Sequence, residues 1–266
     1  MNVPEDYRQW YIENLKNSDN AWYAPMNRSY AIKYAREHGY DYLVQLDDNI
    51  CLLEIAYLDK KSNPQKRFRI TSNIDMMDDF IDMYEAVLEN TNAVMVGASM
   101  SGATVPEMKF MREGYVYSFF MLKLSKCPDV FQGDFEDDIE YRLKCRQMGL
   151  PVVQVVPLRY GKIGQQKNKD LSGCREEYAR AGIKRGEHMK VLYGDMYDAM
   201  MTNKSNSVMS HKEKEAVYFK HILTPFKLGV IVYDMEAIKA CFKRIIRENA
   251  PHTPDKTVIK TKRKKG

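Results

Sequence analysis

The alternation of apolar and polar residues along the chain predicts helices and strands that follow one another. Residues 29–38 repeat their apolar positions at helical spacing, and residues 78–90 do the same. Short apolar runs at residues 41–46 and 93–99 are typical of strands. The second run is apolar on both sides, which indicates a strand inside a sheet. Helices that alternate with strands in this way indicate an α/β fold.

The later part of the pattern continues the alternation and then changes. We expect strands over residues 115–124 and 150–158, with a helix over residues 135–149 that begins with acids and ends at a glycine. After about residue 160 the chain becomes polar and basic, and residues 203–214 are typical of a linker. A strand-like stretch and a last helix are expected within residues 218–247.

The composition narrows the class of protein. Hydrophobic residues make up 44% of the chain and charged residues 29%, as in ordinary globular proteins. No apolar stretch approaches the roughly 20 residues of a membrane span, and the N-terminus lacks the apolar core of a signal peptide. The five cysteines are scattered without a CxxC pair, which argues against a disulfide framework or a zinc knuckle. We therefore expect a cytoplasmic protein with no membrane partner.

Two adjacent aspartates, Asp47 and Asp48, directly follow the strand at residues 41–46. Because burying two like charges side by side is costly, they either face water in a turn or hold a cation. Ligands bind beyond the carboxyl ends of strands in open α/β sheets, and carboxylate oxygens suit Mg²⁺ or Mn²⁺. The pair is thus a candidate metal site, with a solvated turn as the alternative.

A second acidic group precedes the helix expected at residues 135–149. Glu136, Asp137, Asp138 and Glu140 fall within five residues, which is more than the capping of a helix requires. A carboxylate held close to a metal could act as a general base. Arg28, just before the first predicted helix, is either a surface charge or the partner of a phosphate.

These pieces resemble glycosyltransferases of the GT-A fold, in which one strand ends in acids and a second acidic motif opens a helix. Here they are "NRSYAIKYAREHGYDYLVQLDDN" and "DDIEYRLKCRQMG". "VPEDYRQWY" is similar to the end of the first nucleotide-binding strand. Only "MNV" precedes Pro4, so either that strand is short or an upstream piece is missing. "GYVYSFFMLKL" and "LRYGKIGQQKNKDLSG" more narrowly resemble the TET-associated glycosyltransferases of phages and bacteria, which are implicated in adding sugars to 5-hydroxymethyl-pyrimidines in DNA.

The resemblance covers about residues 3–200 and implies a fold and a division of the chain. The fold would be α/β, with a GT-A-like mixed, mostly parallel sheet flanked by helices and a mainly helical C-terminal extension. Residues 1–200 would form the transferase domain, with Asp47 and Asp48 at the tip of a central strand. Residues 201–266 would hold the linker, an α/β extension and a basic tail. The protein would be bacterial or phage-encoded, with no obligate protein partner.

The resemblance also implies a reaction: a metal-dependent enzyme would move a sugar from a nucleotide-sugar, most simply a UDP-sugar, to a hydroxyl. Asp47 and Asp48 would contact Mn²⁺ or Mg²⁺. In an inverting enzyme Asp138 would deprotonate the acceptor, or Asp137 if the motif is shifted by one residue. The expected donor contacts are Pro4, Glu5, Arg28 and Asp47.

Basic residues after the core would hold the backbone of DNA that carries hydroxymethylated pyrimidines. A pyrimidine in a duplex would have to be flipped out to reach the acids. A solvated basic surface is the alternative interpretation of the same residues. The expected DNA contacts are Lys162, Lys167, Lys169, Arg175, Lys184 and Arg185.

Two other classes of protein stay open from the sequence. A nucleotidyltransferase also uses metal-binding carboxylates, but it usually carries a glycine-rich phosphate loop near its start, and the sequence shows none. A non-catalytic nucleic-acid-binding module on a decayed transferase fold is favoured by the short first strand. The presence of both acidic motifs counts against such a module.

Overall fold

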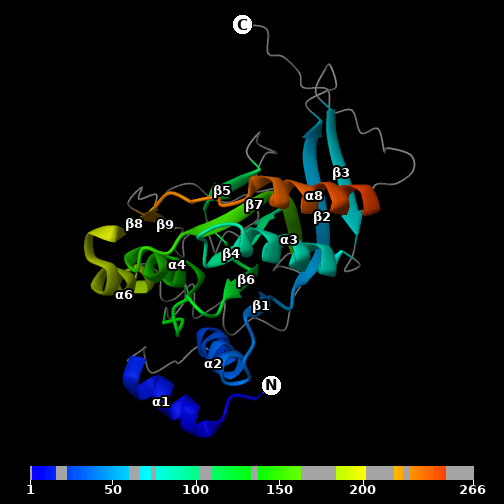
Figure 1. The fold of residues 1–266 in the computed structure, drawn as a ribbon. Helices are drawn as coiled ribbons and strands as arrows, with labels where there is room; N and C mark the ends of the chain where they lie inside the picture. Colours follow the sequence, from blue (N-terminus) through cyan, green and yellow to red (C-terminus); the bar gives the residue numbers. More distant parts are fainter. Residues whose placement is uncertain are drawn as a thin grey trace, which may run out of the picture.

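The chain folds around one mixed β-sheet with helices on both faces (Figure 1). The computed structural model describes residues 2–15, 23–59, 66–72, 76–101, 110–114, 116–132, 137–162, 184–201, 219–223 and 228–249. The helices are α1 (Glu5–Leu15), α2 (Tyr23–Glu37), α3 (Met77–Glu89), α4 (Asp137–Gln147), α6 (Lys184–Tyr193), the 3-10 helix η3 (Gly194–Met196) and α8 (Met235–Asn249). The strands are β1 (Tyr42–Leu46), β2 (Ile50–Asp59), β3 (Lys66–Ser72), β4 (Met95–Met100), β5 (Met111–Glu113), β6 (Phe119–Lys123), β7 (Val152–Lys162), β8 (Tyr197–Met201) and β9 (Phe219–Leu223).

The main sheet has the strand order β1-β6-β4-β7-β2-β3, with β5 paired to β7. β4 and β7 run parallel, whereas the other described pairings are antiparallel. The expectation of a mostly parallel sheet is therefore wrong, because β6 runs back between β1 and β4 and β2 runs back along β7. β4 is internal as predicted, but β1 ends the strand order of the described sheet, so the prediction that the two aspartates follow a central strand is also wrong.

Successive residues of a strand point to opposite faces of the sheet, so the apolar residues of the strands build two cores, one on each face. On β6, Phe119 and Met121 face a core shared with α3 and α8, while Phe120 and Leu122 face a core shared with α2 and α4. The predicted helices over residues 29–38, 78–90 and 135–149 are confirmed as α2, α3 and α4. Burial in the second of these cores holds α2 and α4 against the sheet.

Two glycines end helices as their positions predict. Gly39 follows α2 with a φ of 73°, and Gly149 follows α4 with a φ of 72°. Glycine adopts this left-handed conformation without steric cost, so it commonly ends a helix there. Both stops let the chain turn directly into the next strand, β1 after α2 and β7 after α4.

The opening of the chain is a helix, so its interpretation as the end of a nucleotide-binding strand is wrong. Pro4 precedes the first turn of α1, which carries the acids Glu5 and Asp6, and both features favour a helix start. Tyr7 and Tyr11, four residues apart, lie on the buried face of α1. The hydroxyl of Tyr11 donates a 2.6 Å hydrogen bond to the carbonyl of Phe131, which ties α1 to the segment before α4.

The last described helix, α8, packs on α3 as part of the core. Ile238 and Ile245 are fully buried, and Arg244 donates to Asp82 at 2.5 Å. The helix was predicted, but the described part of the strand-like stretch before it, from residue 228, forms an isolated bridge between Thr91 and Val232 and no regular strand. β8 and β9 pair in a separate two-stranded sheet. The predicted linker at residues 203–214 lies outside the described residues, and the domain division at residue 200 stays a prediction.

None of the helices that the structure describes is long and apolar enough to cross a lipid bilayer.

Candidate functional site

Asp47 lies where β1 ends and the chain turns into β2. Its backbone N–H donates to the carbonyl of Ser118 at 2.9 Å, which fixes the end of β1 against β6. The turn continues through Asp48, whose side chain is exposed. The adjacent aspartates therefore have different environments: Asp48 is in a solvated turn, and the carboxylate of Asp47 points to cationic side chains.

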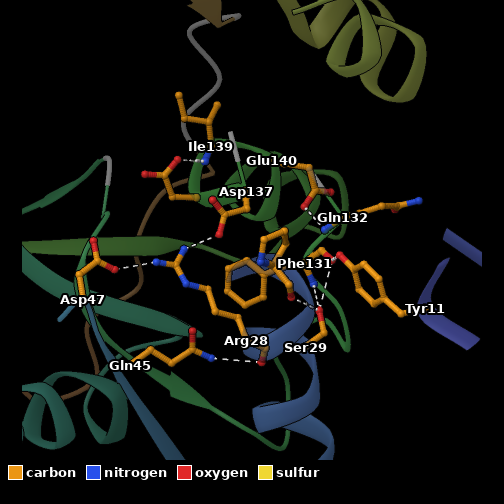
Figure 2. A network of polar contacts seen from close by, with 12 residues as sticks. Tyr11, Arg28, Ser29, Gln45, Asp47, Phe131, Gln132, Asp137, Ile139 and Glu140 are labelled. Atoms are coloured by element: carbon orange, nitrogen blue, oxygen red, sulfur yellow. Dashed lines mark hydrogen bonds and ion pairs between the residues drawn. The ribbon is translucent and has the colours of Figure 1, made fainter. Parts of the chain in front are cut away.

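Both oxygens of the Asp47 carboxylate accept a charged hydrogen bond. Arg28 donates to Oδ1 at 2.8 Å, and Lys162 donates to Oδ2 at 2.6 Å. A second guanidinium nitrogen of Arg28 donates to Oδ2 of Asp137 at 2.5 Å. Figure 2 shows Arg28 between the two carboxylates. The end of the first acidic strand and the start of the second acidic motif are thus brought together, as predicted, by one arginine.

Arg28 is held in this position by aromatic rings and by α2. Its guanidinium carbon lies 5.8 Å from the ring centre of Phe120 and 5.7 Å from that of Phe131. Burial lowers the pKa of Arg28, but the charges of Asp137 and Asp47 outweigh burial, so the net shift is upward. Arg28 is therefore a fixed cation inside the fold, and the surface-charge alternative does not apply to it.

A polar network holds Phe131 beside Arg28 (Figure 2). The N–H of Phe131 donates to the hydroxyl of Ser29 at 2.9 Å, and that hydroxyl donates to the carbonyl of Pro25 at 2.7 Å. The ring of Phe131 stacks on Tyr141 of α4 with centroids 3.8 Å apart. Residues next to Arg28 in the chain thus also fix the segment that leads into α4.

The two carboxylates bonded to Arg28 have pKa values shifted in opposite directions. Burial raises the pKa of Asp47, but the hydrogen bond from Lys162 and the charge of Arg28 lower it further, so the net pKa lies below the ordinary 3.8. Burial raises the pKa of Asp137 above 3.8, and Arg28 only partly offsets this. Carboxylates whose pKa values are pushed apart are common in sites that transfer protons.

The acids at the start of α4 divide into two roles. Asp137 faces Arg28, whereas Asp138 is half-buried and accepts the N–H of Ile139 at 2.8 Å. The charge of Asp138 acts on Arg28 and on the hydroxyl of Tyr160, so it lies close to the same site. Which of the two aspartates serves as base stays a prediction.

Glu140, one turn further along α4, is structural. Its side chain is completely buried, and it accepts the N–H of Gln132 at 2.9 Å and the hydroxyl of Tyr193. Lys144 lies 3.2 Å from the same carboxylate. Glu140 therefore joins α4 to α6 and to the segment that carries Phe131. Glu136, the fourth acid of the group, lies outside the described residues.

Sequence reasoning missed three neighbours of Asp47. The ammonium of Lys162, which was predicted to contact DNA, pairs with Asp47, and the contact with DNA stays a prediction. Ser118 and Tyr160 are almost fully buried beside it, and contact with Ser118 lowers the pKa of Asp47 and of Tyr160, although burial raises the latter overall. Lys162 is the last residue of β7 and Asp47 directly follows β1, but no local signal in the sequence links the ends of these two strands.

The remaining predicted residues lie elsewhere or cannot be placed. Pro4 and Glu5 are exposed at the start of α1, where Glu5 lies 3.8 Å from Arg8. Lys184 and Arg185 begin α6. The others predicted to contact DNA, Lys167, Lys169 and Arg175, lie outside the described residues.

The carboxylates provide the right donor atoms for a divalent ion, but each oxygen of Asp47 already accepts a hydrogen bond from a cation. Carboxylate oxygens suit Mg²⁺ and Mn²⁺. Within the described ranges, however, no three His, Cys, Asp or Glu side chains form a group that could hold a metal ion. Because Arg28 and Lys162 each bind one Asp47 oxygen, an ion that bound this carboxylate would lie beside two cations and compete with them for it.

Comparison with known proteins gives one match. The family model described as TET-Associated Glycosyltransferase matches residues 15–170, which is more than half of the chain. No curated protein and no solved structure matches significantly. The matched range contains α2, β1 and α4, and therefore Arg28, Asp47 and Asp137.

Proposed function

The chain belongs to the TET-associated glycosyltransferase family, and from this premise we propose that it moves a sugar from a nucleotide-sugar to the hydroxymethyl group of a modified pyrimidine in DNA. The observation that carries the proposal is the bridge from Asp47 through Arg28 to Asp137. It supports one reaction site built from both acidic motifs. A transferase needs cationic groups for the departing diphosphate and a carboxylate for the acceptor proton, and both kinds of group are present there.

The acceptor side of the reaction is assigned to the start of α4. Asp138 is half-buried and its charge acts on Arg28 and on Tyr160, so an acceptor hydroxyl bound beside Arg28 could reach its carboxylate. We assign Asp138 as the base that takes the proton from the hydroxymethyl group as its oxygen attacks the sugar. Asp137 then holds Arg28 in place, and it is the alternative base, favoured by its raised pKa.

The donor side is assigned to the end of β1. A divalent ion, Mn²⁺ or Mg²⁺, held by Asp47 and Asp48 would supply positive charge to the departing diphosphate. Arg28 and Lys162 place two further cations beside the same carboxylate. This concentration of charge supports an anionic donor such as a UDP-sugar, with Arg28 fixed and able to stabilise the leaving group without reorganising.

A direct test supplies the protein with UDP-glucose or other nucleotide-sugars, Mn²⁺, and duplex DNA that carries 5-hydroxymethylcytosine or 5-hydroxymethyluracil. Mass spectrometry of the digested DNA should find a hexose on the modified base, and none with unmodified DNA. Transfer of the sugar to a free nucleotide or to a protein would support the assignment as a glycosyltransferase and contradict DNA as the acceptor. Incorporation of a nucleotide from a triphosphate would instead support a nucleotidyltransferase, and DNA binding without any transfer would support a non-catalytic module.

A further inference from the structure

The two cations on Asp47 differ in how firmly they are held. Arg28 makes hydrogen bonds to both Asp47 and Asp137 and lies between the rings of Phe120 and Phe131. Any movement of Arg28 would leave two partly buried carboxylates without this partner, which is unfavourable. Arg28 is therefore the permanent partner of Asp47.

Lys162 has the opposite character. It is the last residue of β7, its side chain is 26% exposed, and the contact described for its ammonium is the one with Asp47. A lysine is a point charge on a flexible four-carbon stem, so it can change partners by rotating its own side chain. A better anion placed near Asp47 could thus take the ammonium without disturbing the fold.

Charge balance shows what would drive such a change. With both carboxylates ionised, Asp47 and Asp137 are neutralised by Arg28 and Lys162. A divalent ion alone would have to compete with Arg28 and Lys162 for the Asp47 carboxylate, and no anion would be present to receive the displaced ammonium, which is unfavourable. A divalent ion together with the diphosphate of a nucleotide-sugar, which carries two negative charges, adds no net charge, and with a nucleoside diphosphate it adds negative charge. In both cases it brings an anion that can receive the displaced ammonium.

On the basis of the proposed function, we propose that Lys162 is an exchangeable counter-ion of the donor site. In the free protein its ammonium neutralises Asp47. When a nucleoside diphosphate and a divalent ion bind together, the ammonium leaves Asp47 for the diphosphate and frees the Asp47 oxygen for the ion. Lys162 therefore couples the binding of metal to the binding of nucleotide, and it is a donor-binding residue.

The coupling has a measurable signature, because linkage requires each ligand to raise the affinity for the other by the same factor. Mn²⁺ alone should bind the unmodified protein weakly, and UDP should strengthen Mn²⁺ binding by at least about tenfold. Lys162→Gln removes the competing charge, so the affinity for Mn²⁺ alone should rise by about tenfold or more. UDP should then add much less to Mn²⁺ binding, because no lysine is left to be displaced. Lys162→Arg keeps the charge and should keep the weak binding of Mn²⁺ alone.

The experiment titrates Mn²⁺, with and without UDP, by electron paramagnetic resonance, so it needs no sugar transfer and no DNA. Lys123→Gln is the matched control: Lys123 is also paired with a carboxylate, Glu89, and its side chain is 22% exposed. It pairs in register with Tyr42 at the far end of β1 from Asp47, so its removal should change Mn²⁺ affinity less than twofold.

A further variant separates binding at Asp47 from binding elsewhere. Adding Asp47→Asn to Lys162→Gln should abolish the gained Mn²⁺ affinity, and retention of that affinity overturns the proposal. Equal Mn²⁺ affinity in Lys162→Gln and the unmodified protein overturns it as well, provided circular dichroism confirms that the variant is folded. If sugar transfer to DNA fails while this coupling is found, the proposed acceptor falls and the role of Lys162 stands.

Discussion

Arg28 and Asp137 are 109 residues apart in the chain and are joined by a hydrogen bond of 2.5 Å. The same guanidinium binds Asp47, so one side chain connects α2, the end of β1 and the start of α4. Arg28→Met keeps an unbranched side chain beside Phe120 and Phe131 but removes the charge. We expect it to lower the free energy of unfolding by about 1–3 kcal/mol, measured by urea denaturation at neutral pH.

Arg244→Met is the control for this first prediction. Arg244 also bridges two carboxylates, Asp82 at 2.5 Å and Glu248 at 2.9 Å, but its side chain is 38% exposed. Ion pairs at such a surface contribute little, so the loss of stability should stay below about 1 kcal/mol. Equal losses in the two variants would show that Arg28 is no more than another surface ion pair.

The second prediction separates the two aspartates at the start of α4. Asp138→Asn keeps the shape of the side chain but cannot take a proton, so turnover should fall by about a hundredfold or more. Its affinity for the donor nucleotide should not change. Asp137→Asn should weaken donor binding, because it loosens Arg28. Single-turnover sugar transfer and calorimetric titration with UDP measure the two effects separately.

The reverse pattern would also be informative. If Asp137→Asn abolishes turnover with donor binding intact, Asp137 is the base and the motif is shifted by one residue. Unchanged turnover in both variants would show that the second acidic motif only begins helix α4 and takes no part in the reaction. Glu140→Gln is the structural comparison, since the completely buried Glu140 contacts Tyr193 and the backbone N–H of Gln132. It should lower stability with little specific effect on the rate per folded molecule.

Local signals in the sequence were enough to predict the helices α2, α3 and α4 and the site residues Asp47 and Asp137. The helical periodicity of residues 78–90 and the acids before residues 139–149 are properties of short segments, so they could be predicted directly. The direction of the strands could not, because it depends on pairings between distant segments. The opening helix was missed because its apolar positions, Tyr7 and Tyr11, are aromatic and few.

The same distinction explains what was missed around Asp47. Asp47 and Asp137 could be predicted because charged residues next to apolar runs are visible in the sequence. The contact of Lys162 depends on the antiparallel pairing of β7 with β2, in which Ile50 lies opposite Lys162. That register brings the end of β7 to the turn that contains Asp47, and no pattern within either segment determines it.

The third prediction concerns pH and uses the opposite pKa shifts of the two carboxylates. The pKa of Asp47 is lowered in the folded state, so its contribution to stability is complete above pH 3.8 and is lost as pH falls through the lower folded value. Asp47→Asn should thus be less stable than the unmodified protein at neutral pH. The difference between their free energies of unfolding should shrink below pH 3.8.

Asp137 should give the opposite dependence. Its pKa is raised by burial, so its stabilising form is the protonated one, present below pH 3.8 and lost as pH rises through the higher folded value. The stability of the unmodified protein relative to Asp137→Asn should therefore fall as pH rises across that window. Urea denaturation of the three proteins over a pH series measures both slopes, and slopes of the same sign would contradict the assignment.

The last prediction concerns DNA. Basic residues between positions 161 and 190 are expected to neutralise backbone phosphates and release counterions, so affinity for DNA should fall steeply as salt rises. Replacing Lys167, Lys169 and Arg175 together by Gln should weaken binding and reduce the slope of log affinity against log salt by up to about 3. Replacing Lys239, Lys243 and Arg247, on the exposed side of α8, by Gln is a control with the same change of charge, and the slope should not change.

Deleting residues 260–266 should cost some affinity but little turnover on hydroxymethylated DNA. If fluorescence anisotropy finds no salt-dependent binding of the intact protein to DNA, while a free nucleotide is glycosylated, the DNA acceptor is wrong and the transferase assignment survives.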